Sequence, residues 1–256
     1  MIDHVTIRVP DLDQGCRFYR QLFELLAYPD GPVEGGGFIE WTNFSITEVT
    51  PEHPTTRRLH VGFYAESRGV VDAWWQTLTG AGYQSDGAPG PRPDYGPDYY
   101  SAFVLDAAGN SVEAVNNGPR RQPGVIDHLW LRTASLDDAS RFYEAVCPTV
   151  AHTVERYEGR TQIRGSGATF SIVEGQPTEN LHLAFEARNK ETVDSFHRAG
   201  IQAGYASNGA PGERPEYHPG YYGAFLADPD SNNIEAVFHD RQRRLRARSG
   251  LDGTDQ

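Results

Sequence analysis

The chain repeats itself over almost its whole length, and this duplication limits the possible folds more than any other feature. The segment IDHVTIRVPDLDQGCRFYRQLF from Ile2 recurs as IDHLWLRTASLDDASRFYEAVC from Ile126. The segment DGAPGPRPDYGPDYY from Asp86 recurs as NGAPGERPEYHPGYY from Asn208, with ten of fifteen residues unchanged. Self-similarity at a nearly constant distance, 124 residues for the first pair and 122 for the second, indicates two homologous halves. We therefore expect a first domain over 1–118, a linker at 119–124, a second domain over 125–240 and a basic tail without fixed structure over 241–256.

Each half carries the signals of two βαβββ units. Residues 3–9 alternate apolar and polar as a half-buried strand does, and residues 11–26 begin at an acidic cap and keep apolar side chains on one helical face. Further strands are predicted at 37–43, 44–50, 59–65, 99–106 and 111–115, with a helix at 68–82. The repeated segment that starts at Asp86 is too rich in Gly and Pro for a helix or a central strand, so it predicts an ordered loop outside the core.

Composition excludes several classes of protein. The 256 residues suffice for a buried core, and a net charge of -12 with a pI near 5.2 argues against nucleic acid as a partner. The basic run at 241–248 is best interpreted as a solvated tail. No apolar stretch approaches a membrane span, and the first ten residues lack the pattern of a signal peptide. We expect a cytoplasmic globular protein, monomeric or homodimeric, that binds a small molecule.

Three polar positions recur in matching places of the two halves. They are His4, His60 and Glu113 in the first half and His128, His182 and Glu235 in the second. The spacings are 56 and 53 residues, then 54 and 53. Alternate side chains of a strand face opposite sides of a sheet, and the apolar residues of these strands stand at the positions that alternate with the His and Glu residues. All six side chains are therefore expected on the sheet face that is not packed against helices.

If that face curves into a cup, two imidazoles and one carboxylate can converge on one point. Such a set suits a divalent metal ion and leaves positions open for water or substrate. A structural zinc site would take four protein ligands, usually including Cys, and the chain has only Cys16 and Cys147. The sequence therefore predicts a divalent ion (Fe, Zn, Mn or Ni) in at least one half. The alternative is a polar cavity without metal.

The chain resembles the vicinal oxygen chelate (VOC) superfamily, which includes glyoxalase I, extradiol dioxygenases, fosfomycin-resistance enzymes and bleomycin-binding proteins. The resemblance rests on DHV and DHL in the first strands, RFY in the first helices, LHVGF and LHLAF, and LDAAGNSVEAV and ADPDSNNIEAV. It implies an α+β fold of two tandem VOC domains, each a pair of βαβββ units forming a cupped mixed sheet. It also implies that the six recurring residues are the metal ligands. How the units pair, within a half or across halves, stays open.

The resemblance favours a metal-dependent enzyme of the glyoxalase or extradiol-dioxygenase type, which chelates an oxygen-bearing small molecule and transfers a proton. Glyoxalase I adds a fourth ligand, for which Glu48 and Glu174 are nearby candidates. Extradiol dioxygenases typically carry Tyr ten residues before the last-strand Glu, where this chain has Phe103 and Phe225. The alternative function is sequestration of an antibiotic or metabolite, as in bleomycin-resistance proteins.

The halves differ where a pocket mouth is expected. Gly96 aligns with His218, and Thr6 aligns with Trp130. An imidazole with a pKa of ~6.5 can move protons at neutral pH, so the second half is predicted to be the more active one, unless His218 is an ordinary surface residue. The predicted catalytic residues are His218, Tyr221 and Tyr222, and the predicted substrate-binding residues are Trp130, Arg132, Arg214 and Tyr217. The arginines suit an anionic substrate group, although those of the loops can also pair with loop carboxylates.

Overall fold

The structure is a computed structural model that describes residues 1–28, 31–35, 37–120 and 124–240. The predicted basic run at 241–248 lies outside these residues, as do 121–123 of the predicted linker. The elements in chain order are β1 (Ile2–Val9), α1 (Leu12–Leu25), β2 (Val33–Gly35), β3 (Phe38–Trp41), β4 (Phe44–Glu48), β5 (His60–Tyr64), α2 (Arg68–Gly80), β6 (Ser85–Pro91), β7 (Tyr100–Leu105), β8 (Ser111–Asn116), β9 (Ile126–Thr133), α3 (Leu136–Val146), the 3-10 helix η1 (Cys147–Val150), β10 (Thr153–Tyr157), β11 (Arg160–Arg164), β12 (Thr169–Glu174), β13 (His182–Glu186), α4 (Lys190–Gln202), β14 (Ser207–Glu213), β15 (Tyr221–Ala227) and β16 (Asn233–His239).

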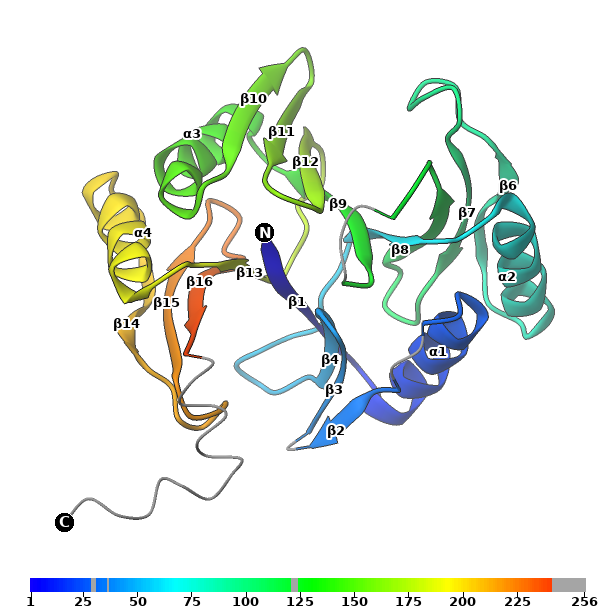
Figure 1. Ribbon diagram of the computed structural model, residues 1–256, viewed down its shortest axis with the longest axis horizontal. Helices are drawn as coiled ribbons and strands as arrows, with labels where there is room; N and C mark the ends of the chain where they lie inside the picture. The colour runs from blue at the N-terminus through cyan, green and yellow to red at the C-terminus, as the bar shows by residue number, and fades with distance from the viewer. Residues whose placement is uncertain (29–30, 36, 121–123, 241–256) are drawn as a thin grey trace.

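These elements form four βαβββ units, which pair across the two halves of the chain (Figure 1). One sheet has the strand order β14-β15-β16-β13-β1-β4-β3-β2, and the other has the order β10-β11-β12-β9-β5-β8-β7-β6. We call them the β1–β13 sheet and the β5–β9 sheet after the antiparallel central strands that join their units. The predicted α+β class with two mixed sheets is confirmed. The boundary between the sequence halves separates the repeats, whereas each sheet contains one unit from each half.

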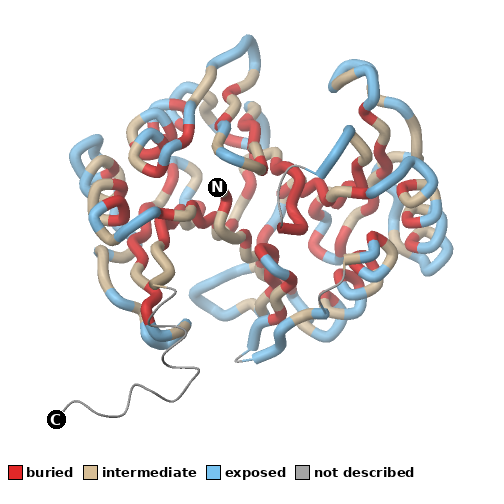
Figure 2. Tube along the Cα trace, in the orientation of Figure 1, coloured by how far each residue is buried: buried red, intermediate tan, exposed pale blue. Residues whose placement is uncertain are grey.

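The helices cover the sheet faces onto which the apolar side chains of the strands project. Val5, Ile7 and Val9 of β1 are at most 4% exposed, as the alternation predicts. Helix α1 begins at the cap Asp11, whose side chain accepts the Gln14 backbone N–H, and it packs on β4. Helices α2, α3 and α4 pack on β7, β12 and β15 in the same way, and the buried residues follow the strands between them (Figure 2). Within the described residues, no helix is long and apolar enough to cross a membrane.

The Gly- and Pro-rich segments differ in part from the loops that the sequence predicts. Each begins as a strand, β6 or β14, before the chain turns back into β7 or β15. Both are edge strands whose register shifts twice, and most of their residues are partly or fully exposed. Proline is tolerated at a sheet edge because its missing N–H leaves no ladder bond unmade on the outer side. The prediction of a loop was therefore wrong for the first six residues of each segment, and both segments lie outside the core.

Candidate metal centres

The six recurring polar residues lie in two groups of three, and each group combines both halves of the chain. His4, His182 and Glu235 meet on the β1–β13 sheet, and His60, Glu113 and His128 meet on the β5–β9 sheet. Within each group one ligand atom per residue lies within 4.8 Å of the others. Because β1 pairs with β13 and β5 with β9, the first-strand histidine of one half joins the later ligands of the other half. We call these groups the β1–β13 triad and the β5–β9 triad.

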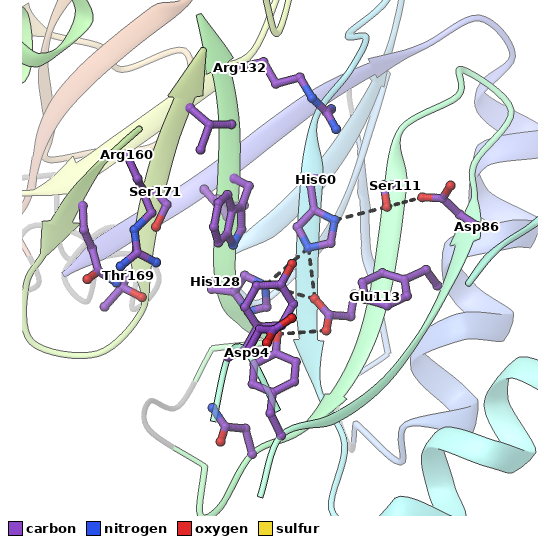
Figure 3. Close-up of a pocket in the computed structure, with 18 residues that line it drawn as sticks. His60, Asp86, Asp94, Ser111, Glu113, His128, Arg132, Arg160, Thr169 and Ser171 are labelled. Carbon is purple, nitrogen blue, oxygen red and sulfur yellow. Dashed lines mark hydrogen bonds and ion pairs between the residues drawn. The ribbon is translucent and has the colours of Figure 1, made fainter. Parts of the chain in front are cut away.

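The β5–β9 triad converges tightly (Figure 3). Glu113 Oε2 lies 3.0 Å from His60 Nε2 and 3.0 Å from His128 Nε2, and the two Nε2 atoms are 3.3 Å apart. Glu113 is 1% exposed, so its charge has almost no contact with water. A buried carboxylate with two imidazole nitrogens around one point is a set that holds a divalent ion and leaves further positions open.

The hydrogen bonds behind these histidines fix their tautomers. Ser111 Oγ donates its single proton to Asp86 Oδ2 at 2.7 Å, so it can only accept from His60 Nδ1 at 3.1 Å. His128 Nδ1 lies 2.9 Å from the Asp127 carboxylate, which also only accepts. In their neutral forms both histidines therefore carry their proton on Nδ1 and turn the Nε2 lone pair toward Glu113. Three acceptors around one point need a cation between them, and the outer carboxylates are the partners that metal-bound histidines usually have.

The charges around the β5–β9 triad favour positive charge at its centre. Burial disfavours an imidazolium, but Glu113 and Asp127 outweigh it and raise the pKa of His128 to about 9. Burial also disfavours the ionised form of Glu113, but the two histidines outweigh this and hold the pKa of that carboxyl well below its usual range. The carboxylate is thus ionised and attracts a proton or a metal ion.

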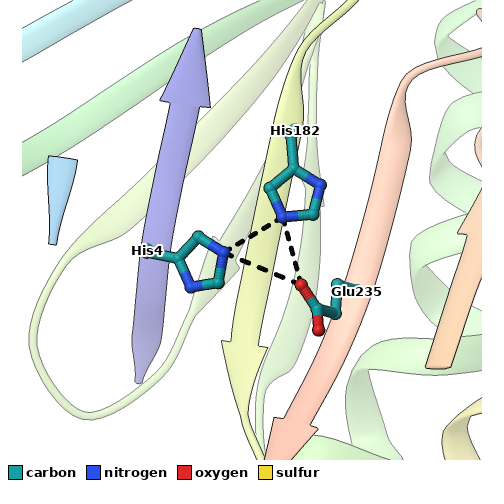
Figure 4. Close-up of side chains that lie close together, drawn as sticks. All are labelled: His4, His182 and Glu235. Carbon is teal, nitrogen blue, oxygen red and sulfur yellow. Dashed lines mark hydrogen bonds and ion pairs between the residues drawn. The ribbon is translucent and has the colours of Figure 1, made fainter. Parts of the chain in front are cut away.

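The β1–β13 triad has the same composition and a looser geometry (Figure 4). His182 Nε2 lies 3.0 Å from His4 Nε2 and 3.1 Å from Glu235 Oε2, and His4 Nε2 lies 3.7 Å from that oxygen. His4 Nδ1 lies 2.7 Å from the Asp3 carboxylate, so its Nε2 also presents a lone pair. Among the described residues Glu235 Oε2 is a buried oxygen without a hydrogen bond of good geometry. A bound cation would satisfy it in place of the His182 Nε2 proton, which the neutral ring carries because the Asn233 amide N–H donates to Nδ1 at 2.7 Å.

Two tyrosines contact the triads, and their sequence neighbours point the other way. Tyr99 donates its hydroxyl proton to Glu113 Oε1 at 2.9 Å, and Tyr221 donates to Glu235 Oε1 at 2.7 Å. Tyr222, predicted as catalytic, instead donates to Asp194 on α4, because side chains alternate along β15. The structure therefore brings Tyr221 to a triad and leaves Tyr222 on the helix-packed face.

A cavity of about 490 Å³ opens over the β5–β9 triad. Its lining includes Trp130 and Arg132, two of the predicted substrate-binding residues, and it also includes Arg160, whose guanidinium lies 5.8 Å from the Trp130 ring centre. Figure 3 shows Arg160 on the far side of the cavity from Glu113. Sequence reasoning missed Arg160 and the lining carboxylate Asp94, since the first is not matched by Arg in the other half and the second lies in a loop.

The remaining predicted residues lie outside this cavity. His218 Nε2 meets His239 Nδ1 at 2.8 Å beside the β1–β13 triad, and the Tyr217 ring packs against the Tyr221 ring. Arg214 donates to the backbone carbonyls of Glu213 and Ala210 in its own segment, whereas the alternative drawn from the sequence was a pairing with a loop carboxylate. Of the predicted second-half residues, His218, Tyr217 and Tyr221 thus gather at one sheet, while Trp130 and Arg132 gather at the other. The crossed pairing separates them.

The two candidates for a fourth ligand do not join either triad. Glu48 and Glu174 are exposed at the last positions of β4 and β12, opposite Val9 and Thr133. Strand positions closer to the triads carry Ser45 and Ser171, because β4 pairs Ser45 with Thr6 and β12 pairs Ser171 with Trp130. Each described triad therefore offers two His and one Glu, without a second Glu from these strands.

Comparison with known proteins agrees with this architecture. Residues 1–114 match the model of the Glyoxalase/Bleomycin resistance protein/Dioxygenase superfamily. The lactoylglutathione lyase GLX1 of Arabidopsis thaliana is 31% identical over 167 residues, which are 60% of this chain and 57% of that protein. The chain thus spans less than three-fifths of the length of this curated relative. The crystal structure of glyoxalase I from Zea mays aligns with a TM-score of 0.66 at 16% identity over 99% of this chain and 96% of that one, a likeness of fold.

Proposed function

Because the chain is a tandem member of the glyoxalase/bleomycin resistance protein/dioxygenase superfamily, we propose that it is a metal-dependent enzyme with its active centre at the β5–β9 triad. The observation that carries the proposal is the convergence of two Nε2 lone pairs and the Glu113 carboxylate at the cavity. A divalent ion held there would act as a Lewis acid on two neighbouring substrate oxygens. Proton transfer next to a carbonyl, as in a lactoylglutathione lyase, is the reaction that this site suits.

The residues around the cavity divide the remaining tasks. Arg132 and Arg160 line it with two guanidinium groups, which can bind carboxylates of the substrate bidentately. Tyr99 holds Glu113 in place through its hydrogen bond. Asp94 is the proposed proton acceptor: of the three lining carboxylates, Glu113 belongs to the triad and Asp86 accepts from Ser111. General base catalysis of this kind contributes about 10²–10⁴-fold to a rate.

Ring cleavage of catechols is the less favoured reaction of this superfamily. The position ten residues before Glu113 holds Phe103, which lines the cavity and lies 5.8 Å from the His60 ring, so no hydroxyl stands there for proton transfer. The lyase reaction needs no oxygen, and the curated relative carries that name. We therefore assign proton transfer on a hemithioacetal-type adduct as the proposed chemistry.

The test compares matched variants of the two triads. Chelator-stripped full-length protein is reloaded with Zn²⁺, Ni²⁺, Mn²⁺ or Fe²⁺ and assayed with the hemithioacetal of methylglyoxal and glutathione, and with catechols for oxygen uptake. Glu113→Gln should abolish both metal binding at this triad and the lyase rate, while Glu235→Gln should leave most of the rate. Asp94→Asn should lower the rate about 10²-fold or more with the metal content unchanged, and Glu216→Gln at the matching position should not. Full activity of Glu113→Gln, or tight ligand binding by metal-free protein without turnover, would refute the proposal.

A further inference from the structure

A third pair of histidines faces nitrogen to nitrogen, outside both triads. His218, in the turn before β15, and His239, the last residue of β16, place Nε2 and Nδ1 2.8 Å apart. Their ring centroids are 5.0 Å apart with an interplanar angle of 23°. We call these two residues the imidazole pair. His239 is 24% exposed and His218 is half-buried, so solutes can reach them.

The partners of the imidazole pair leave both facing nitrogens as acceptors. His218 Nδ1 lies 2.9 Å from the Pro219 carbonyl oxygen, which only accepts, so the proton of the neutral ring sits on Nδ1. His239 Nε2 lies 3.1 Å and 3.2 Å from the two oxygens of Asp3, which also only accept, so its proton sits on Nε2. Two lone pairs at 2.8 Å repel unless a proton or a metal ion lies between them.

The pair repeats the geometry of the histidines in the two triads. His4 and His182 have centroids 5.1 Å apart with nitrogens at 3.0 Å, and His60 and His128 have centroids 5.4 Å apart with nitrogens at 3.3 Å. In all three pairs the rings point nitrogen to nitrogen. Two cis nitrogens that bind one ion at about 2.1 Å are separated by about 3 Å, which is the spacing seen in each pair.

Asp3 completes the outer sphere of the imidazole pair. Its carboxylate contacts His239 Nε2 on one side and His4 Nδ1 on the other, so one side chain supports a histidine of the pair and a histidine of the β1–β13 triad. A carboxylate behind the second nitrogen is the usual partner of a metal-bound histidine, since it fixes the tautomer and raises the basicity of the ring. The Tyr221 ring packs edge-on against both imidazoles and limits their rotation.

The imidazole pair is present in one copy only. At the matching positions of the first half stand Gly96 and Asn117, which line up with His218 and His239 in the repeat. The matching carboxylate Asp127 and the matching Tyr99 are retained beside the β5–β9 triad. The scaffold is therefore the same at both places, and the two imidazoles are an addition at the β1–β13 sheet.

We propose that His218 Nε2 and His239 Nδ1 form a third metal site, which binds one divalent transition metal ion with imidazole affinity, such as Zn²⁺, Ni²⁺ or Cu²⁺. Imidazole nitrogens prefer these ions over Mg²⁺ and Ca²⁺. With two ligands from the part of the chain that the structure describes, the site leaves its other positions to water or to an anionic solute, so it binds more weakly than the triads. This site is independent of the function proposed above.

The test counts Zn²⁺ ions per chain. The protein is stripped with chelator and dialysed to equilibrium against a fixed excess of Zn²⁺, and the bound ion is the difference in Zn²⁺ between the two compartments, measured by mass spectrometry of the metal. His239→Asn, which copies the residue at 117, and His218→Asn should each bind one equivalent less than the unchanged protein. His53→Asn removes an exposed histidine outside all three sites and should bind the full number. Equal melting curves verify that the variants are folded.

A second background isolates the imidazole pair from the triads. The double variant His60→Ala/His182→Ala lacks one ligand of each triad, and adding His239→Asn to it should remove one further equivalent. An unchanged count in His239→Asn in both backgrounds would overturn the proposal and leave the pair as two imidazoles that share a proton. The same loss in His53→Asn would also overturn it, since Zn²⁺ would then be binding to surface histidines. If the triads bind no metal, the difference of one equivalent still decides the proposal.

Discussion

Gly62 lies under the ring of His128, and Gly62→Ala should displace that ligand. The two residues are direct partners in the β5–β9 ladder. A Cβ on Gly62 would lie 2.3 Å from His128 Cε1 and 2.9 Å from Nε2, whereas ordinary contacts begin near 3.4 Å. The buried ring would have to retreat by about 1 Å, and metal ligands tolerate only about 0.2 Å. We expect a loss of about 10- to 100-fold in metal affinity at this triad, or about 1.4 to 2.7 kcal/mol.

The assay for Gly62→Ala is a Zn²⁺ titration of chelator-stripped protein by calorimetry, carried out in the Glu235→Gln background so that the β5–β9 triad dominates the signal. The matched control is Ala184→Gly, because Ala184 faces His4 in the other ladder as Gly62 faces His128. Removing that methyl group creates no overlap and should leave the affinity of the β5–β9 triad unchanged. An unchanged affinity in Gly62→Ala would refute the reasoning, since His128 would then have another ring position that keeps its nitrogen at the ion.

Three further predictions follow from other contacts. Tyr99→Phe removes the hydrogen bond to Glu113 and should lower metal affinity or lyase rate about tenfold, whereas Tyr221→Phe should not; equal effects of both would contradict the assignment of the active centre. Burial lowers the pKa of His152 to about 4. Below pH 6.5 this histidine therefore binds a proton in the unfolded chain but stays neutral in the folded chain until the pH approaches 4. Stability should therefore fall between pH 6.5 and 4, by about 2.5 kcal/mol at pH 4.5 relative to pH 7, and urea unfolding of His152→Leu should show that much less pH dependence. Chelation of the metal should lower the melting temperature by a few degrees. In the control variant Glu113→Gln/Glu235→Gln, which lacks a ligand of each triad, the chelator should leave the melting temperature unchanged.

The alternation of side chains along a strand explains why the sequence predicted the sheet face of the triad residues correctly. Side chains of a strand alternate strictly, so the apolar partners of His4, His60 and Glu113 reveal which face each residue occupies. The same rule fails to identify the tyrosine that contacts a triad, because Tyr221 and Tyr222 are adjacent and only the start of β15 decides which one faces the triad. Face assignment is thus secure inside a strand and uncertain at its ends.

The crossed pairing of the units is not visible in the sequence. Units with near-identical patterns offer near-identical edges, so β1 could pair with β5 or with β13 on parity alone. The structure pairs β1 with β13, and His4 consequently joins Glu235 rather than Glu113. Contacts between distant segments decide such a choice, and local patterns carry no information on them. The imidazole pair was missed for a related reason, since His239 closes its strand 21 residues after His218.

The crossed pairing also changes the meaning of the differences between the halves. Compared half with half, Thr6 is replaced by Trp130 and Gly96 by His218. In space Trp130 belongs with the segment of Gly96 at the β5–β9 sheet, and Thr6 belongs with that of His218 at the β1–β13 sheet. Each sheet therefore combines one large ring with one small residue. Each sheet takes its first strand from one half and its Gly- and Pro-rich segment from the other, so substitutions in either half can alter either sheet. The two sheets can therefore diverge without a change in either triad. One then has a cavity with Arg132 and Arg160, and the other has a histidine-rich site.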